Sequence, residues 1–456
     1  MGAVRQYDGL FKAYDIRGVY SKELDTKFAY KLGKAFVHFT KTKEVAVGYD
    51  GRTSSKKLFE ALTKGILEQG ADIIDIGQIS TPGCYYSLLT GKYQNAIMIT
   101  ASHLPKQYNG FKLMSKGGSP IFLSNGGSEI MDIIHENEYP KPKKKGKKKK
   151  KSWMKEYKKY LSSTLLKNKT VKSQLKKLKI VIDQSNGTGY VETDVLKEAM
   201  PKAKVINTRI SGTFPGHDPD PLHPQSRKKL GIEVKNTKAS FGIIYDGDAD
   251  RVCFVDEKGQ FIRPDILLNI MVKDYKSGKI IYDTRSSKAV AEIAKKQGLH
   301  PIMSKSGRSY IIEAMKNEQA ELGGEGSGHY YFKELKGLDC GGLAAIKVIL
   351  RYLADNTKKE KNMSEIVQEN NPYFHSGEVN FKVKNPSKAF LIIEQGFREA
   401  QKTLFIDGLS VYYEDFWFNV RKSNTEPLIR INAESDTKEG LDKIMKSLNK
   451  VMALSK

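Results

Sequence analysis

Three carboxylates stand at alternate positions in the segment Asp246-Gly-Asp248-Ala-Asp250-Arg251, between the apolar runs 241–245 and 252–255. On an extended backbone these side chains project to one side. Like charges so close repel each other unless a cation neutralises them, and an all-oxygen ligand set favours a hard ion such as Mg²⁺. An EF-hand is excluded because Arg251 stands where its loop requires glycine. The segment predicts a metal site, with a hydrated acidic turn as the alternative.

A second polar segment, Thr100–Pro105, follows the apolar run 96–99. A serine in a loop at the end of a strand suits a nucleophile or a phosphate carrier, so Ser102 is the candidate. His103 could orient a group or move a proton there, and Lys112 could supply positive charge. The segment lacks the G-x-S-x-G pattern of hydrolases. The alternative is an ordinary polar turn with a capping serine.

Two further segments carry groups suited to sugars and phosphates. Glycine-rich 323–329 offers side chains that can bind hydroxyls, namely Glu325, Ser327 and His329. The turn 421–427 and the arginine beyond it offer guanidinium, hydroxyl and amide groups that could cradle a phosphate, namely Arg421, Ser423, Asn424, Thr425 and Arg430. The alternatives are a lone glycine-rich loop and an Asn/Pro turn with incidental arginines.

Short apolar runs that alternate with helix-length amphipathic stretches must position these groups. The runs predicted as strands are 45–48, 71–76, 96–99, 178–182, 205–207, 241–245, 252–255 and 279–282. This alternation predicts α/β layers with parallel or mixed sheets, and ligands in such sheets bind beyond the carboxyl ends of the strands. The last ~90 residues read as α+β, with strands at 410–414, 416–420 and 428–432 before a helix after Lys438.

Composition breaks divide the chain into four predicted domains. Their ranges are 1–150, which carries the Ser102 loop and ends in a lysine-rich linker, 151–257 with the acidic turn, 258–370 with the glycine-rich loop, and 371–456 with the phosphate turn. The linker is the run 141–151, which holds nine lysines.

The chain is strongly basic, with 77 Lys and Arg against 52 Asp and Glu and a net charge of +25. Such an excess fits anionic substrates, a lysine-rich solvated surface, nucleic acid or an anionic membrane. Several arginines lie beside polar residues in glycine-rich segments, among them Arg17 and Arg52, which favours an anionic substrate. Zinc-finger spacing and an RNA-recognition signature are absent, so the sequence predicts no specific nucleic-acid partner.

The apolar runs are too short to cross a bilayer, and the amino terminus has no signal-peptide pattern. The cysteines, Cys84, Cys253 and Cys340, are far apart and match no metal or disulfide pattern. We therefore expect a cytoplasmic protein without a membrane partner.

In their order and spacing, five motifs resemble the α-D-phosphohexomutase family, specifically its phosphomannomutase/phosphoglucomutase branch. They are YDIRG at 14–18, TASHLP at 100–105, DGDADR at 246–251, GEGSGH at 324–329 and RKSNTEP at 421–427. The resemblance implies three related mixed α/β domains and a smaller C-terminal α+β domain around a central active-site cleft. It also implies Mg²⁺, hexose phosphate substrates, and glucose 1,6-bisphosphate or mannose 1,6-bisphosphate as activator. A monomer is expected, with a dimer as the alternative.

Carried over by position, Ser102 would be the phosphorylated serine and, with Asp246, Asp248 and Asp250, would hold the metal. The resemblance implies that the sugar is bound by Glu325, Ser327 and His329, and the non-reacting phosphate by Arg421, Ser423, Asn424, Thr425 and Arg430. It implies that the reacting end is lined by Arg17, His103, Lys112 and Arg251. Further cleft residues would be Tyr14, Arg285 and Arg308. The implied reaction interconverts hexose 1-phosphate and hexose 6-phosphate of mannose or glucose through a hexose 1,6-bisphosphate.

The sequence departs from the family's usual pattern at five places: Leu104, Gly326, Lys422, Arg308 and Cys340. None of them removes the serine, the carboxylates or the Glu325 and Ser327 pair. Because Gly326 lies inside the sugar loop, the preferred hexose stays open. Three alternatives remain: a phosphoglucosamine mutase, a haloacid-dehalogenase-like phosphatase with Asp246 as nucleophile, and a basic nucleic-acid binder.

Overall fold

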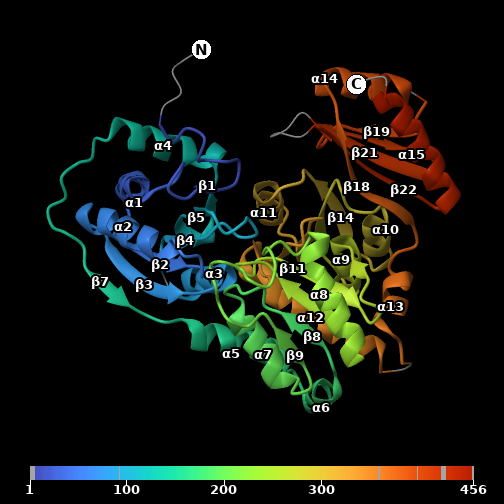
Figure 1. The fold of residues 1–456 in the computed structure, drawn as a ribbon, viewed down its shortest axis with the longest axis horizontal. Coiled ribbons are helices and arrows are strands. Elements are labelled where there is room, and N and C mark those ends of the chain that lie inside the picture. The colour runs from blue at the N-terminus through green and yellow to red at the C-terminus, as the bar shows by residue number, and fades with distance from the viewer. Residues whose placement is uncertain (1–5, 92, 358–359, 398, 423–427, 454–456) are drawn as a thin grey trace. The chain divides into compact units, whose positions relative to one another are not determined.

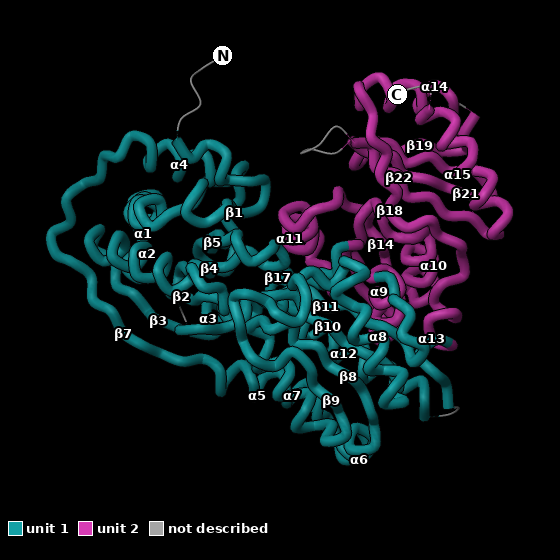
Figure 2. The backbone as a smooth tube through the Cα atoms, in the orientation of Figure 1, with its two compact units in different colours: residues 1–263, 327–364 teal, residues 264–326, 365–456 magenta. Residues whose placement is uncertain are grey.

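The computed structural model describes residues 6–91, 93–357, 360–397, 399–422 and 428–453. By its internal packing, the chain divides into two compact units, coloured separately in Figure 2. Unit 1 contains residues 1–263 and 327–364, and unit 2 contains residues 264–326 and 365–456. These units cut the chain differently from the four predicted domains, whose boundaries stay a prediction.

The first sheet of unit 1 has the strand order β1-β5-β4-β2-β3-β7, with β6 paired to β5 (Figure 1). The strands β3, β2 and β4 are parallel, and β5 runs antiparallel to both β4 and β1. The strand bounds are β1 Ile16–Val19, β2 Glu44–Tyr49, β3 Asp72–Gln78, β4 Ala96–Ile99, β5 Tyr108–Met114, β6 Pro120–Ile121 and β7 Lys148–Lys150. The helix bounds are α1 Thr26–Thr40, α2 Ser55–Glu68, α3 Thr81–Thr90 and α4 Gly127–Glu136, with short 3₁₀ turns at Lys116–Gly118 and Leu123–Asn125.

Helices cover both faces of this sheet because its central strands are apolar on both sides. Val45 and Val47 of β2 belong to the core that the sheet forms with α1, α2 and α4. Gly48, on the opposite face, approaches Ile76 and Ile79, beside the start of α3. This face matters for the site, because α3 begins there. Ser80 caps α3 by accepting a hydrogen bond from the Gly83 N–H.

A second sheet of unit 1 has the order β12-β11-β10-β8-β9, in which β10, β8 and β9 are parallel and β10–β11 is an antiparallel hairpin. The strand bounds are β8 Val181–Asp183, β9 Lys204–Ile206, β10 Phe241–Tyr245, β11 Val252–Asp256 and β12 Phe261–Ile262. The helix bounds are α5 Met154–Leu165, α6 Lys169–Lys177, α7 Tyr190–Ala199, α8 Pro224–Thr237 and α12 Gly341–Asp355. Before α12 come β16 Tyr330–Phe332, a 3₁₀ turn at Lys333–Leu335, and β17 Leu338–Asp339.

The lysine run corrects one expectation. The sequence predicted a flexible linker through 141–151, but Lys148–Lys150 form β7, parallel to β3 at the sheet edge. The Ile73 N–H donates to the Lys147 carbonyl at 2.9 Å, and Lys148 Nζ lies 3.0 Å from Asp75 Oδ2. The prediction was wrong here because β3 offers an open row of backbone groups, which the lysine main chain pairs while the side chains stay exposed.

Unit 2 contains two separate layers of strands. The strands β14, β13 and β15 are parallel, and the carboxy-terminal sheet is antiparallel in the order β18-β22-β21-β20-β19. The bounds of the first group are α9 Pro264–Val272, β13 Lys279–Asp283, α10 Ala289–Lys296, β14 His300–Ser304, α11 Arg308–Asn317 and β15 Leu322–Gly324. The bounds of the rest are α13 Met363–Glu369, which begins in unit 1, β18 Phe374–Lys382, α14 Pro386–Gly396, β19 Lys402–Leu404, β20 Leu409–Tyr412, β21 Phe416–Lys422, β22 Leu428–Ser435 and α15 Lys438–Ala453.

Candidate active site

Ser102 lies in the loop between β4 and β5 and is 1% exposed. Its φ of 51° is in the left-handed region, which costs free energy for a residue other than glycine. The Ser102 N–H donates to Thr100 Oγ1 at 2.9 Å, and Ser102 Oγ donates to Asp246 Oδ2 at 2.7 Å. The fold thus brings together the serine and the first carboxylate that the sequence singled out.

Arg52 binds the main chain of this loop. Its guanidinium donates to four main-chain carbonyl oxygens: those of Ser102 (2.8 Å), Leu104 (2.6 Å) and Pro105 (2.8 Å) in the loop, and that of Tyr108 (3.0 Å) at the start of β5. Arg52 Nε lies 3.1 Å from Asp50 Oδ2, and the same oxygen accepts a hydrogen bond from Thr100 Oγ1 at 2.8 Å. Arg52 is buried, so its five donors serve the loop and Asp50, not a ligand. The sequence had suggested an anionic ligand for it.

Asp246, Asp248 and Asp250, hereafter the acidic cluster, lie in the turn between β10 and β11. All three are buried, and each offers an oxygen within 4.8 Å of the others. Burial, followed by the charges of Asp250 and Asp248, raises the pKa of Asp246 well above its usual range. Burial alone would also raise the pKa of Asp250, but Lys112 and then His329 hold it well below the usual range.

The acidic cluster fits a divalent cation. Its donors are all carboxylate oxygens, the set that Mg²⁺ prefers. Asp248 Oδ1 is buried and accepts no hydrogen bond from any residue that the structure describes. Lys112, on β5, places Nζ 2.7 Å from Asp248 Oδ2 and also contacts Asp250 Oδ2. A second group of possible ligands consists of Asp250, His329 and Asp339.

Of the predicted reacting-end residues, His103 contacts Ser102 itself. His103 Nδ1 lies 3.3 Å from Ser102 Oγ. Burial, then the charges of Arg251 and Arg17, lowers the pKa of His103 well below its usual range, so the imidazole is neutral at neutral pH. Arg251 Nε lies 3.9 Å from Asp246 Oδ2, and Arg17 pairs with Asp15 at 2.7 Å. Tyr14 lies in the loop before β1 and is half-buried.

The predicted sugar loop straddles the two units. In unit 1, Ser327 Oγ lies 2.8 Å from His329 Nδ1, and His329 Nε2 lies 3.3 Å from Asp250 Oδ1. In unit 2, Glu325 Oε2 accepts a hydrogen bond from the Gly307 N–H at 3.2 Å and lies 3.7 Å from Arg285 Nη2. Ser327 and His329 therefore contact groups of unit 1, and Glu325 contacts groups of unit 2.

Unit 2 holds the remaining predicted residues. Arg285 follows β13 and pairs with Asp283 at 2.6 Å, and Arg308 begins α11 and is buried. Arg421 and Arg430, on β21 and β22, both pair with Glu378 of β18. The predicted phosphate ligands Ser423, Asn424 and Thr425 lie outside the described residues.

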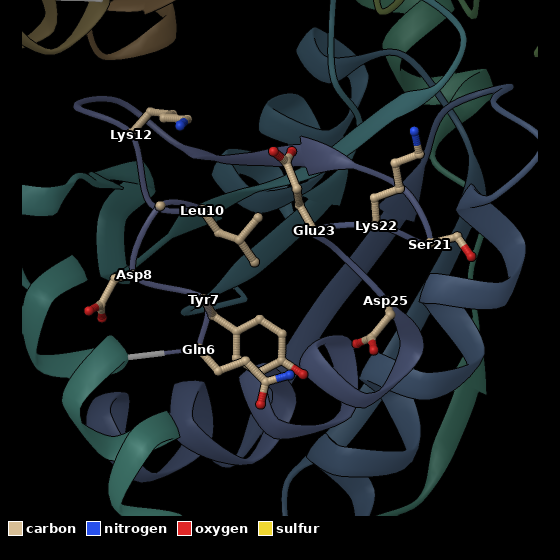
Figure 3. A pocket seen from close by; sticks show the side chains of 10 residues that line it. Gln6, Tyr7, Asp8, Leu10, Lys12, Ser21, Lys22, Glu23 and Asp25 are labelled. Atoms are coloured by element: carbon tan, nitrogen blue, oxygen red, sulfur yellow. The ribbon is translucent and has the colours of Figure 1, made fainter. Parts of the chain in front are cut away.

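A pocket of about 350 Å³ opens elsewhere in unit 1. Figure 3 shows the side chains that line it, which come from the segments 6–12 and 21–25. Its lining includes no residue that the sequence proposed for the site. This pocket is therefore separate from the Ser102 and acidic-cluster chemistry.

Sequence reasoning missed two residues that touch the predicted site, Thr81 and Glu378, and it misassigned a third, Arg52. Thr81, the first residue of α3, donates from Oγ1 to Asp248 Oδ2 at 2.5 Å and from its N–H to the Asp248 carbonyl at 2.9 Å. Arg52 was noticed but given another role, and Glu378 was not noticed. The Ser80-Thr81-Pro82 pattern could have predicted a helix start, but nothing in it indicates a contact 167 residues away.

Four family models match nearly the whole chain in sequence order. They are "Phosphoglucomutase/phosphomannomutase, alpha/beta/alpha domain I" at residues 8–141, domain II at 155–259, domain III at 263–373 and the C-terminal domain at 378–451.

Full-length relatives agree with the family models. A phosphomannomutase of Methanocaldococcus jannaschii is 38% identical, with 97% of each chain covered. A phosphoglucomutase of Neisseria meningitidis is 31% identical, with 97% of this chain and 96% of the other covered. Among solved structures, a phosphoglucomutase/phosphomannomutase family protein of Burkholderia thailandensis is similar, with a TM-score of 0.85, 28% identity, and 99% of this chain and 98% of the other covered.

Proposed function

Because the chain belongs to the phosphoglucomutase/phosphomannomutase family, we propose that it interconverts the 1-phosphates and 6-phosphates of mannose and glucose through phosphorylated Ser102. The observation that carries this proposal is the 2.7 Å hydrogen bond from Ser102 Oγ to Asp246 Oδ2. This contact supports the proposal because it links a candidate phosphate carrier to a buried carboxylate cluster that fits a hard cation.

The phosphoryl group on Ser102 Oγ passes to the free hydroxyl of a hexose monophosphate. The bond from the serine oxygen to phosphorus breaks and Ser102 Oγ takes up a proton, while a bond from the sugar oxygen to phosphorus forms and the sugar hydroxyl gives up its proton. The resulting hexose 1,6-bisphosphate turns over, and its other phosphate returns to Ser102. Added glucose 1,6-bisphosphate or mannose 1,6-bisphosphate would phosphorylate an unmodified Ser102 and so activate the enzyme.

The chain's own residues position and neutralise the reacting groups. Mg²⁺, held by the acidic cluster together with the Ser102 phosphate, would neutralise charge on the transferring phosphoryl group. Lys112, Arg251 and Arg17 supply positive charge near the same serine. Neutral His103 can accept or return the proton of the Ser102 hydroxyl, because its Nδ1 lies 3.3 Å from Ser102 Oγ.

We propose that the other predicted residues bind the parts of the substrate that do not react. Glu325, Ser327 and His329 would bind sugar hydroxyls. The non-reacting phosphate would bind to Arg421, Ser423, Asn424, Thr425 and Arg430. Tyr14, Arg285 and Arg308 are further candidates for contact with the substrate. A phosphate cradle that must accept either end of the substrate binds phosphate generically and leaves the choice of hexose to the sugar loop.

We also propose a monomer in the cytoplasm. Cys84, Cys253 and Cys340 are free thiols and all three are buried, which supports a reducing compartment. No described helix has the length and apolar character needed to span a membrane.

Phosphorylation of Ser102 can be tested directly. The full chain is incubated with glucose 1,6-bisphosphate and Mg²⁺, and its intact mass is compared with that of the Ser102→Ala variant. We expect the wild-type chain to gain the mass of one phosphoryl group, mapped to Ser102 by peptide fragmentation, and the variant to gain nothing. A phosphoryl group on another residue, or none on either chain, would refute the phosphoserine proposal.

A further inference from the structure

Two arginines of the proposed phosphate cradle face each other across a strand pair. Arg421 of β21 is the direct partner of Arg430 on β22 in the antiparallel register. Side chains at directly opposed positions lie on the same face of a sheet, and like charges there destabilise it. An anion between the two guanidinium groups would remove this repulsion.

Glu378, on the other neighbour of β22, supplies such an anion. Asn380 is the residue opposite Arg430, so Glu378 is the diagonal neighbour two positions away, on the same face. One of its carboxylate oxygens contacts Nη2 of Arg421, and the other lies 3.3 Å from Nη1 of Arg430. One carboxylate therefore bridges the terminal nitrogens of both arginines.

The surroundings keep this carboxylate ionised. Burial alone would raise the pKa of Glu378, but Arg421 and the other nearby arginines, Arg285 and Arg430, lower it below its usual value. The Nε atoms of Arg421 and Arg430 have no hydrogen-bond partner among the described residues. Arg421 and Arg430 thus share one carboxylate, and the Nε of each is a donor that no described residue uses.

We propose that Glu378 stands in for the substrate's non-reacting phosphate and must be displaced when a hexose phosphate binds. This inference rests on the proposed function, because it takes Arg421 and Arg430 as phosphate ligands. A phosphate dianion carries more charge and more acceptor oxygens than a carboxylate, so it can engage the terminal and the Nε nitrogens together. The Glu378 side chain is 29% exposed, which leaves it room to turn away.

The same contacts would have the opposite consequence if Glu378 only oriented the arginines. A stand-in anion competes with the substrate, so its removal tightens binding. An orienting anion prepares the arginines, so its removal weakens binding. The sign of one affinity change separates the two roles.

The experiment measures the Kd of glucose 6-phosphate by calorimetry on the full chain, in a Ser102→Ala background that prevents turnover. Glu378→Gln removes the charge and keeps the shape, and Glu378→Ala repeats the test without the amide. Glu414→Gln is the matched control, because Glu414 is an exposed residue before the far end of β21 and its loss changes the net charge equally. The melting temperature of each variant checks folding.

We expect both Glu378 variants to bind glucose 6-phosphate roughly 3- to 10-fold more tightly than the parent, the range that two partly exposed ion pairs represent. The Glu414 variant should stay at the parent value. An unchanged or weaker affinity in the Glu378 variants overturns the inference, as does equal tightening in Glu414→Gln. If the parent binds no hexose phosphate at all, the proposed function fails, and the inference fails with it.

Discussion

The guanidinium of Arg52 donates a hydrogen bond to the main-chain carbonyl of Ser102 at 2.8 Å, from a strand-end loop 50 residues earlier in the chain. Ser102 has a left-handed backbone, and such a conformation persists only where its surroundings hold it. Arg52 meets this need because it binds three carbonyls of the loop and one at the start of β5, and is itself held by Asp50.

Replacing Arg52 with lysine should destabilise the protein and disorder the serine loop. An ammonium group cannot reproduce the planar fork, so several buried carbonyls lose their donors. We expect the free energy of unfolding to fall by roughly 3 kcal/mol, measured by urea denaturation. Arg209→Lys, at an exposed arginine of the same unit, is the control and should be neutral. Equal stability of the two variants would show that Arg52 does not hold the loop.

Thr81 should act on the acidic cluster through Asp248. Thr81→Val removes the hydroxyl that donates to Asp248 Oδ2 but keeps the shape, whereas Thr81→Ser keeps the hydroxyl. Because groups that orient metal ligands typically contribute a factor of about 10 to 100, we expect the valine variant to need at least about 10-fold more Mg²⁺ for half-maximal activity. The serine variant should stay near wild type. Equal Mg²⁺ requirements in both variants would contradict this role.

Glu192 should make stability depend on pH. It is buried on α7, where Ser80 and Tyr157 donate to its Oε1 at 2.6 and 2.9 Å, and burial raises its pKa from 4.5 to about 7. The folded protein therefore retains a proton that the unfolded chain loses above pH 4.5. The resulting stabilisation is fully present below pH 4.5 and is lost as the pH rises through about 7.

The matched variant Glu192→Gln stays neutral at every pH. The stability of the wild type relative to this variant should therefore fall by about 3 kcal/mol between pH 4.5 and pH 8. Urea denaturation at a series of pH values measures the difference. Parallel curves for the two proteins would mean that Glu192 ionises as an ordinary exposed carboxyl does.

Gly146 should be needed for the lysine strand to dock. A Cβ at this position would lie 1.9 Å from the Ala71 carbonyl oxygen, too close for any real contact. Gly146→Ala should push 146–150 from β3, speed hydrogen exchange at the Ile73 amide, and lower stability by about 1–2 kcal/mol. Gly9→Ala, where no atom lies within 4 Å of the added Cβ, is the control. Unchanged exchange at Ile73 in the Gly146 variant would argue against docking.

Local patterns were sufficient to predict much of the fold. The strands at 96–99 and 241–245 have the predicted bounds, because polar turns interrupt their apolar runs sharply. The lysine strand could not be predicted, because exposed lysines pair through backbone groups that the sequence pattern does not reveal. The start of β8 was predicted three residues early, because Leu178 and Ile180 are apolar but lie outside the parallel pairing, which begins at Val181.

Motifs indicated the residues of the site, but not how those residues are held. Ser102 and Asp246 were each predicted from local sequence. Their contact joins residues 144 positions apart, which local patterns do not indicate. Arg52 looked like an anion ligand because Asp50 and polar residues flank it. In the structure Arg52 is buried and binds main-chain carbonyls instead. These contacts are with residues 50 to 56 positions away, which the local sequence does not indicate.

The most direct test follows glucose 1-phosphate and mannose 1-phosphate by phosphorus NMR, in separate tubes with the enzyme, Mg²⁺ and a trace of glucose 1,6-bisphosphate. The account predicts that both tubes develop the 6-phosphate resonance, and that Ser102→Ala, folded as judged by its melting temperature, produces neither. Inorganic phosphate as the sole product, or a normal rate in the Ser102→Ala variant, would contradict it.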